Sequence, residues 1–310
     1  MNPPGHSRMV RIAWIFCLIL LPLVLLHGQV RVVSLSPTPT EIVYALGAGR
    51  QLVGATSVCI EPPEVLRDIN EGRVKIVSNF NVTNMALIDS LKPDVILTDT
   101  DFQRKITADL RAKGYTVLHF VPRRLEEVFK SIEEIGEAIG RGTFARQLTA
   151  QYRAEIDSIK EKSRLLPKTR VYLEVNHIGP WAVGAVSPLN DLIIAAGGES
   201  IFADSACGVF KTTNEEIVRR NPDVILSPIW LHAKLGRYDG ITPLAEIYSR
   251  KGYDATGAVQ RSRVLYYDSA LLKHEGPRQV LAIRKLAHIL HPEVFPDPPG
   301  TIPWELGWIR

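Results

Sequence analysis

Four histidines are the residues of this chain best suited to bind a metal ion or haem. His119, His177, His232 and His274 each lie in or next to a predicted strand. Imidazole nitrogens are common ligands of zinc, manganese and haem iron, and non-haem sites combine several of them with carboxylates. No spacing in the sequence brings three of these histidines together. We therefore predict no metal site and no cofactor, while one histidine as an axial ligand of haem iron or cobalt stays open.

Three cysteines are too few for a disulfide scaffold, and none has the paired CxxC spacing of a zinc or redox site. Cys17 lies in an N-terminal apolar run, whereas Cys59 and Cys207 lie in predicted loops near strand ends. An exported protein could join Cys59 to Cys207 in a disulfide. Because such a bond would restrict the motion of the two halves of the chain, we expect two free thiols instead.

Signatures of the common nucleotide-binding and hydrolytic enzymes are absent from the sequence. It contains no GxGxxG, no Walker A loop, no GxSxG and no HExxH. The segment GVFKTT at 208–213 has a Lys-Thr pair without the glycines of a phosphate-binding loop. We therefore predict that the chain is not an enzyme, with an exported α/β enzyme as the less favoured alternative.

The N-terminal segment predicts export. Arg8 and Arg11 precede a continuous apolar run at Ile12–Leu26, and no acidic residue lies before it. A basic segment followed by a short apolar one is typical of a secretory signal, and this run is shorter than the roughly 20 residues of a spanning helix. We expect residues 1–28 to be a signal peptide or an uncleaved anchor, and the protein to be periplasmic or otherwise extracytoplasmic.

The composition is that of a folded soluble protein. Of the 310 residues, 45% are hydrophobic and 23% are charged, and the formal net charge is +4. Two arginines of the N-terminal segment account for half of that charge, which leaves +2 on the rest. No basic stripe with interleaved aromatic residues is present, so we expect no nucleic-acid partner.

Two stretches nearly repeat each other: LKPDVILTD at 91–99 and RNPDVILSP at 220–228. In each, a proline ends the preceding helix, an aspartate can bond to the turn, and a short apolar run reads as a buried strand. Strands alternate with helices around both copies, which predicts parallel sheets covered on both faces. We infer two α/β lobes of similar plan that arose by internal duplication.

Between the lobes, the period of the apolar residues indicates two charge-rich helices, with a break near Gly140 and Gly142. Near the start of the first lobe, Thr38 and Glu41 have the spacing of a helix capping box. The predicted organisation is an N-terminal lobe at 30–142, a connecting helix at 143–167, a C-terminal lobe at 168–296 and a tail at 297–310.

Five segments carry a resemblance to known proteins. They are RVVSLSPTPTEIVYALGAGRQLVGATS, LKPDVILTD, AAGGESIFAD, TTNEEIVRRNPDVIL and GPRQVLAIRKLAHILHPEVF, and they run from Arg31 to about Pro296. In order and spacing they resemble the periplasmic substrate-binding proteins of ABC importers for vitamin B12, ferric siderophores and haem, and the cobalamin-binding members most. The resemblance implies a monomer of class III architecture, in which one long backbone helix joins two similar parallel-sheet α/β lobes.

The resemblance also implies a ligand between the lobes, and ligands of open α/β sheets lie outside the carboxyl ends of the strands. Aromatic side chains would pack against a large flat ligand, and polar groups would meet its periphery. Asp101, next to one strand end, is expected to face the basic residues of the other lobe. The ligand-binding residues that we predict are Cys59, Phe80, Asp99, Trp181, Phe210, Trp230, Lys273 and His274.

Members of this family carry an exposed glutamate on each lobe, which meets arginines of the membrane permease. On the second lobe the resemblance places this residue at Glu215. Thr213 and Glu216 have capping-box spacing, so Glu216 is expected to serve the helix and Glu215 to stay free. On the first lobe the position is Ala86, which departs from the family pattern. Asp89, one turn further along, is the predicted substitute; otherwise this lobe docks differently or not at all.

These resemblances imply a receptor that captures cobalamin or a similar corrinoid and delivers it to an ABC permease with its ATPase. Haem, a ferric siderophore or a metal ion would suit a receptor of the same fold, and a tethered scaffold or sensor without transport is a further alternative. The stiff connecting helix implies a small hinge motion of the lobes.

Overall fold

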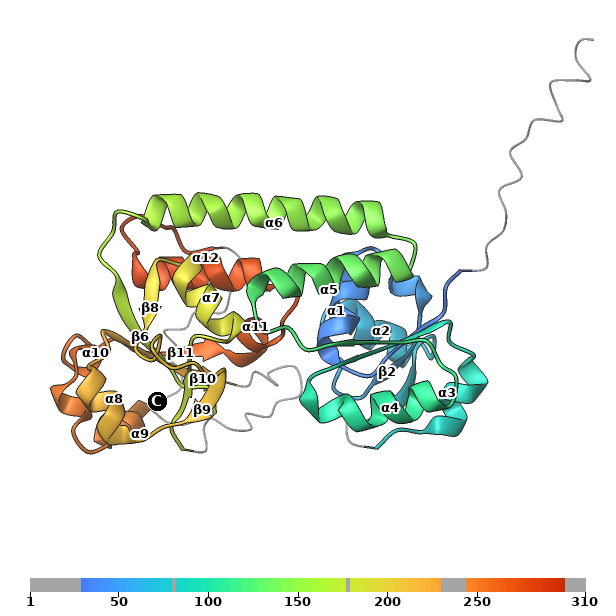
Figure 1. Cartoon of the computed structure of the whole chain (residues 1–310), viewed down its shortest axis with the longest axis horizontal. Coiled ribbons are helices and arrows are strands. Elements are labelled where there is room, and N and C mark those ends of the chain that lie inside the picture. The colour runs from blue at the N-terminus through green and yellow to red at the C-terminus, as the bar shows by residue number, and fades with distance from the viewer. Residues whose placement is uncertain (1–28, 80–81, 177–178, 230–243, 299–310) are drawn as a thin grey trace, which may run out of the picture.

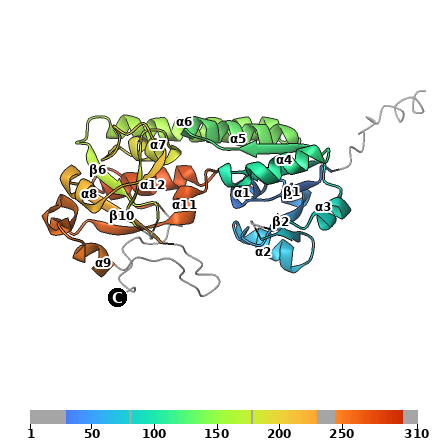
Figure 2. The same cartoon turned by 60° about the horizontal axis from the view of Figure 1, so that its bottom comes forward.

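The computed structural model describes residues 29–79, 82–176, 179–229 and 244–298 of the chain. Two α/β lobes lie side by side, and one long helix runs along the top of both (Figure 1). A view turned by 60° shows the same separation into two lobes (Figure 2). The predicted fold class, two parallel-sheet lobes joined by a backbone helix, is therefore confirmed.

The N-terminal lobe has a five-stranded sheet in which every pair of strands is parallel, in the order β3-β2-β1-β4-β5. Alternate residues of a strand point to opposite faces, so Val32 packs with α1 and α5 while Val33 packs with α3 and α4. The strands are β1 (Val32–Ser34), β2 (Leu52–Thr56), β3 (Lys75–Ser78), β4 (Val95–Asp99) and β5 (Val117–Phe120). The helices are α1 (Pro37–Ala45), α2 (Pro63–Asn70), α3 (Met85–Leu91) and α4 (Arg104–Ala112), with 3₁₀ turns η1 (Gly49–Gln51) and η2 (Asp101–Gln103).

The C-terminal lobe has a four-stranded parallel sheet in the order β11-β10-β6-β8, and a small antiparallel pair, β7 with β9. Its strands are β6 (Thr169–Leu173), β7 (Trp181–Val183), β8 (Gly198–Ser200), β9 (Val209–Lys211), β10 (Val224–Ile229) and β11 (Val264–Asp268). Its helices are α7 (Pro188–Ala195), α8 (Asn214–Arg220), α9 (Leu244–Ser249), α10 (Gly257–Gln260), α11 (Ser269–Lys273) and α12 (Gln279–Leu290), with the 3₁₀ turn η4 (Tyr253–Ala255).

The two near-repeated stretches build the same junction in both lobes. In the first, the backbone N–H of Arg31 donates to the Asp94 carboxylate at 2.7 Å, and the N–H of Asp94 donates to the Arg31 carbonyl at 2.9 Å. In the second, Arg170 and Asp223 exchange the same two bonds at 3.0 and 2.8 Å. The aspartate of each Pro-Asp thus aligns its strand beside the first strand of its lobe.

The turn before each proline is also repeated. Lys92 ends α3 with φ 45° and ψ 60°, and Asn221 ends α8 with φ 45° and ψ 77°. Few residues other than glycine adopt this left-handed conformation. The two lobes share a sequence stretch, an uncommon backbone turn and a hydrogen-bonding pattern. These shared features are expected if the lobes arose by internal duplication.

Helices α5 (Leu125–Ala138) and α6 (Gly142–Ser163) are separated by Gly140, whose φ is +70°. The predicted break is therefore confirmed. Helix α6 has 22 residues, which makes it about 33 Å long at 1.5 Å per residue. It ends earlier than the connecting helix predicted at 143–167.

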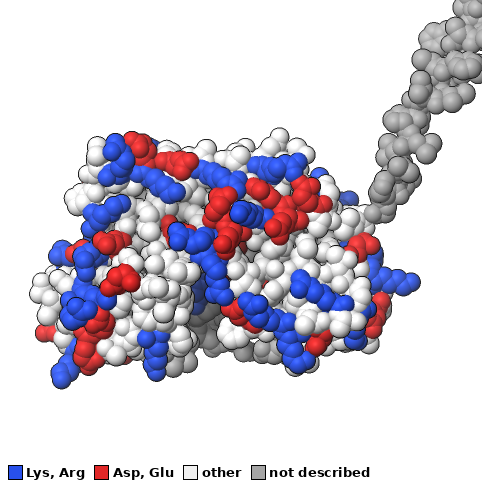
Figure 3. Space-filling view, in the orientation of Figure 1, with Lys and Arg blue, Asp and Glu red and all other residues white. Residues whose placement is uncertain are grey.

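Ion pairs fasten α6 to both lobes. Arg153 pairs with Glu126 and Glu133 of α5, and Glu155 pairs with Arg284 of α12. Acidic and basic side chains are accordingly interleaved along this face, with no continuous basic stripe on the side shown (Figure 3). Within the described residues, no helix is long and apolar enough to cross a membrane.

Candidate ligand-binding cleft

Helices α1 and α11 face each other across the seam between the lobes (Figures 1 and 2). Each directly follows a central or edge strand of its own sheet, so the carboxyl ends of both sheets lead into this seam. In open α/β sheets this is where ligands bind. The predicted location of the cleft therefore has a structural counterpart, and the residues on either side of it define the candidate site.

The lobes are joined at the seam by an ion-pair cluster around Glu41. Its Oε1 lies 2.6 Å from His274 Nδ1, and Arg278 donates from Nε to Oε2 at 2.8 Å and from Nη2 to Oε1 at 2.9 Å. The Glu41 side chain is only 3% exposed. Burial acts to raise the pKa of Glu41, but the hydrogen bonds and charges of His274 and Arg278 outweigh it, so the pKa is lowered.

The capping box predicted for Thr38 and Glu41 is wrong. Helix α1 begins at Pro37 with Ser36 as its N-cap, and no side chain caps it. Glu41 instead lies on the side of α1 that faces the other lobe. Local spacing could not reveal this role, because the partners of Glu41 lie more than 230 residues further along the chain.

Two carboxylates from opposite lobes share a small cavity at the seam. Asp99 at the end of β4 and Glu275 after α11 both line it. Burial raises the pKa of Asp99 to about 6, although hydrogen bonds from Ser36 and Thr38 act to lower it. Burial and the charge of Asp99 raise the pKa of Glu275 to about 8. Glu275 is not among the residues predicted from the sequence, although it directly follows His274.

Lys273 supplies a partly buried cation on the C-terminal lobe. Its Nζ donates to the backbone carbonyl of Val175, after β6, at 2.9 Å. Burial lowers the pKa of Lys273 to about 8. The two predicted residues Lys273 and His274 thus lie next to each other at the seam, and His274 bonds to Glu41 of the other lobe.

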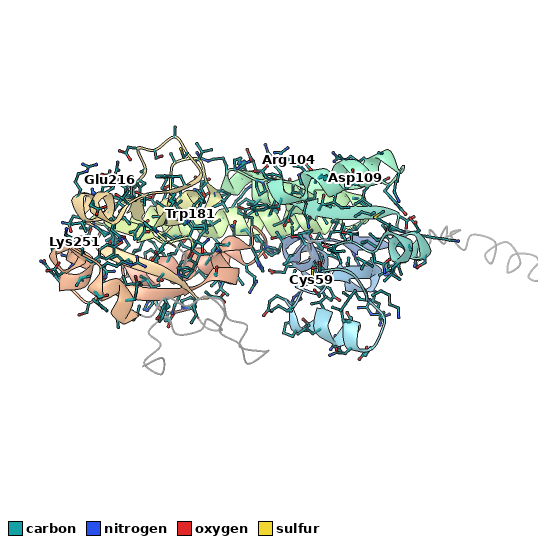
Figure 4. The ribbon with its side chains drawn as sticks, turned by 90° about the horizontal axis from the view of Figure 1, so that it is seen from below. Cys59, Arg104, Asp109, Trp181, Glu216 and Lys251 are labelled. Atoms are coloured by element: carbon teal, nitrogen blue, oxygen red, sulfur yellow. The ribbon has the colours of Figure 1, made fainter. Side chains whose placement is uncertain are left out.

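An exposed aromatic residue, Phe102, projects from the η2 turn that follows β4. Its side chain is 89% exposed, and Val58 and Val82, which follow β2 and β3, are 40% and 70% exposed. Figure 4 shows Arg104, two residues beyond Phe102, at the end of α4 nearer to the C-terminal lobe, and Asp109 further away. Phe102 is not among the residues predicted from the sequence, although an aromatic residue just after a strand end is a recognisable signal.

Two of the three aromatic residues predicted in the second lobe lie within the described residues, and their surroundings differ. Trp181 begins β7 and is half-buried (Figure 4). Phe210 in β9 packs edge-on against Phe202 of its own lobe, with ring centroids 5.5 Å apart. Part of the Trp181 side chain is therefore exposed to solvent, whereas Phe210 packs against the core of the C-terminal lobe.

Cys59 lies in the core of the N-terminal lobe and does not line the cleft. It is fully buried, and its Sγ lies 3.1 Å from Thr40 Oγ1 and 3.2 Å from Thr56 Oγ1. Burial raises the pKa of this thiol. Cys59 and Cys207 are both free, as expected, since Cys207 is exposed on the other lobe.

Several predicted residues cannot be placed. Phe80, Trp230, His177 and His232 lie outside the described residues. His119 lies in β5, with Nδ1 3.0 Å from Thr98 Oγ1. Within the described ranges, no three His, Cys, Asp or Glu side chains are arranged to hold a metal ion.

The candidate docking residues of the two lobes differ in their surroundings. Glu215 is exposed in the first turn of α8, while Thr213 caps that helix by accepting the N–H of Glu216 at 3.2 Å. The Glu216 carboxylate does not complete the capping box, because it pairs with Arg219 and Arg220 instead. Glu215 thus remains available at the surface.

On the first lobe, the surroundings of Asp89 weaken its candidacy. Asp89 is exposed on α3, but its carboxylate accepts a hydrogen bond from the hydroxyl of Tyr115. Ala86, at the position matched by resemblance, is exposed one turn earlier on the same helix. The carboxylate of Asp89 on the first lobe thus already accepts a hydrogen bond, whereas Glu215 on the second lobe has no ion pair with a described residue.

Two lobes that enclose a seam at the carboxyl ends of their strands define a bilobal binding protein. Residues 32–271 match the family described as Periplasmic binding protein, and the chain belongs to that family. The predicted family is therefore confirmed, and with it the prediction that the chain is a binding protein and not an enzyme.

Two curated relatives cover most of the chain. The uncharacterized ABC transporter substrate-binding lipoprotein YvrC of Bacillus subtilis is 32% identical over 276 residues, which cover 86% of this chain and 82% of the relative. The vitamin B12-binding protein of Yersinia pestis is 27% identical over 228 residues, which cover 73% of this chain and 79% of the relative.

Solved structures share the fold at lower identity. The periplasmic vitamin B12-binding protein BtuF of Vibrio cholerae superposes with a TM-score of 0.67 at 23% identity, covering 84% of this chain and 96% of that one. The periplasmic haem-binding protein RhuT of Roseiflexus sp. RS-1 superposes with a TM-score of 0.70 at 24% identity, covering 86% and 100%. At these identities the two structures establish a common fold.

Proposed function

We propose that this chain is the substrate-binding protein of an ABC importer that captures cobalamin or a similar corrinoid between its lobes. One observation carries the proposal: exposed apolar residues follow the strand ends of the N-terminal lobe, and buried polar groups lie at the seam between the lobes. The similarity to a vitamin B12-binding protein over most of the chain supports the corrinoid as ligand.

The chemistry of the seam suits a large ligand that is partly apolar and partly polar. Phe102 on one lobe and Trp181 on the other offer aromatic area, which stabilises a flat ring by contact and offset stacking. Deeper in the seam, Asp99, Lys273 and Glu275 offer acceptors and a donor to polar groups. Pockets for small molecules typically combine apolar walls with a few polar groups in this way.

Delivery would take place outside the cytoplasm, with residues 1–28 directing export and the monomer docking on a permease that is driven by an ATPase. Glu215 is the docking residue that we propose on the C-terminal lobe, because it is exposed and carries no ion pair with a described residue. On the N-terminal lobe we propose Asp89 as the docking residue. On docking, its carboxylate would give up the hydrogen bond from Tyr115 and bind the permease instead.

The test is calorimetric titration of the purified full chain with cyanocobalamin, haem and a ferric siderophore. We expect cyanocobalamin to bind at one equivalent without chemical change and to raise the melting temperature. Ligand at a hundredfold excess over Kd stabilises the folded state by about 2.7 kcal/mol. If haem or the siderophore binds and cyanocobalamin does not, the proposed corrinoid is wrong and the ligand that binds takes its place in the proposal.

A further inference from the structure

We propose that Asp99 and Glu275, one from each lobe, form a subsite that accepts hydrogen bonds from an amide or other N–H group of the ligand. The inference rests on the proposed function and deepens it, because it states which peripheral groups of a corrinoid are recognised. The two carboxylates come from opposite lobes and line the same small cavity at the seam.

The cavity between these carboxylates has the size of a single polar group. Its remaining walls are largely apolar, and they include Pro39, Ile42 and Phe120. The free space admits a group about as large as one water molecule, which is also the size of an NH₂ group. Apolar walls around two acceptors favour a ligand group that satisfies both of them at once.

An unused acceptor points to the same conclusion. The Asp99 side chain is only 7% exposed, and its Oδ1 has no hydrogen-bond partner among the described residues. A buried acceptor without a donor is costly, and native structures rarely leave one unsatisfied. A donor brought by the ligand would remove that cost, and the bond to an ionised carboxylate would be stronger than a neutral one.

The charges that face the two carboxylates set the kind of group that fits. His274 faces Asp99, and Arg123 faces Glu275 from the rim of the N-terminal lobe. Arg123 is already paired with Asp101, and His274 with Glu41. The carboxylates therefore lack a dedicated cation, so a ligand carboxylate would add repulsion while an N–H donor would relieve it.

This subsite would separate ligands of similar size by their periphery. The corrin ring of cobalamin carries primary amides, whereas haem and the hydrolysed corrinoid cobyrinic acid carry carboxylates. Dicyanocobinamide and dicyanocobyrinic acid share one ring and differ in these groups, which makes them a matched pair of probes. We expect the chain to prefer the amide-bearing ligand by at least about tenfold in Kd, the discrimination expected of about one charge-assisted bond.

The experiment is a titration of both probes into the full chain at pH 8, with Glu275→Gln and Asp99→Asn as variants. We expect the preference to fall about tenfold in Glu275→Gln, because an amide accepts more weakly than a carboxylate and can itself donate to a carboxylate. Glu199→Gln, at an exposed position of β8, serves as the control and should keep the full preference.

A second readout does not depend on comparing ligands. Titration of dicyanocobinamide at pH 7 in two buffers of different ionisation enthalpy should show release of about one proton, since a bound donor favours the ionised carboxylate. Glu275→Gln should abolish that release. If both variants keep the full ligand preference and the full proton release, the subsite is wrong and the proposed function still stands. If the wild type binds neither corrinoid, the subsite and the proposed function are both wrong.

Discussion

Glu41 of α1 and Arg278, the N-cap residue of α12, form an ion pair with two hydrogen bonds between the lobes, at N–O distances of 2.8 and 2.9 Å. His274 adds a third bond to the same carboxylate. Because the pair spans the seam, it links the two lobes directly. We expect the connecting helix α6 and this cluster together to restrict the motion of the lobes.

Removing the carboxylate of Glu41 should destabilise the protein strongly. Glu41→Ala removes the carboxylate that pairs with the partly buried Arg278, and the loss of one member of a buried pair costs about 3–5 kcal/mol. Urea unfolding at pH 7 measures the change. Glu137→Ala, which breaks an exposed pair with Arg146, is the matched control and should cost less than about 1 kcal/mol. Equal effects of the two substitutions would contradict a structural role for the seam cluster.

Phe102 should contribute to ligand affinity without contributing to stability. Phe102→Ala removes a side chain that is 89% exposed, so the melting temperature should hardly change. Affinity for cyanocobalamin should fall about tenfold, which corresponds to roughly 1.4 kcal/mol of aromatic contact. Phe144→Ala, on the exposed face of α6, should alter neither quantity. If both substitutions leave the Kd unchanged, Phe102 does not contact the ligand.

The free energy of unfolding should fall as pH rises toward 8. Glu275 has a folded-state pKa raised by burial and by Asp99, from an ordinary value of 4.5 to about 8. Between these values the folded state holds a proton that the unfolded state has lost, so stability decreases with rising pH. Asp99 acts in the same direction up to about pH 6.

Glu275→Gln should therefore flatten the dependence of stability on pH between about pH 6 and 8. Urea unfolding of the wild type and the variant at several pH values in this window gives the two slopes. Two identical slopes would show that Glu275 titrates as an ordinary solvated carboxylate. Asp99→Asn should flatten the same dependence of stability on pH, but at the lower end of this pH range.

Asp191 should stabilise the entry into α5 from the opposite lobe. Its Oδ2 accepts the backbone N–H of Leu125 at 2.8 Å, and its Oδ1 pairs with Arg124 at 2.8 Å. Asp191→Ala removes the acceptor of a backbone N–H in the first turn of α5, and this loss should lower the free energy of unfolding by about 1 kcal/mol. Chemical denaturation measures this loss, and Asp191→Asn should recover part of it because an amide oxygen still accepts.

Glu215 should act in transport and not in ligand capture. Glu215→Lys should leave the Kd for cyanocobalamin unchanged and reduce ligand-stimulated ATP hydrolysis by the cognate importer in liposomes. Glu199→Lys makes the same charge change at another exposed position of the C-terminal lobe and should have no effect. A normal rate of ATP hydrolysis with Glu215→Lys would exclude this residue from docking.

The sequence by itself determined the elements and their order. The repeated Pro-Asp stretches predicted β4 and β10, and both lobes use the aspartate to align these strands beside β1 and β6. Gly140 predicted the break before α6. Such features depend on residues close together in the chain, where the period of apolar side chains and the backbone freedom of a glycine act directly.

Only the tertiary structure decided what the side chains of the seam do. Glu41 has the spacing of a helix cap and instead bonds to His274 and Arg278, and Cys59 lies near a strand end yet is fully buried. Asp99 and Glu275 come together although they are far apart in sequence. Contacts of this kind depend on how two separately folded lobes are oriented, and no local pattern encodes that orientation.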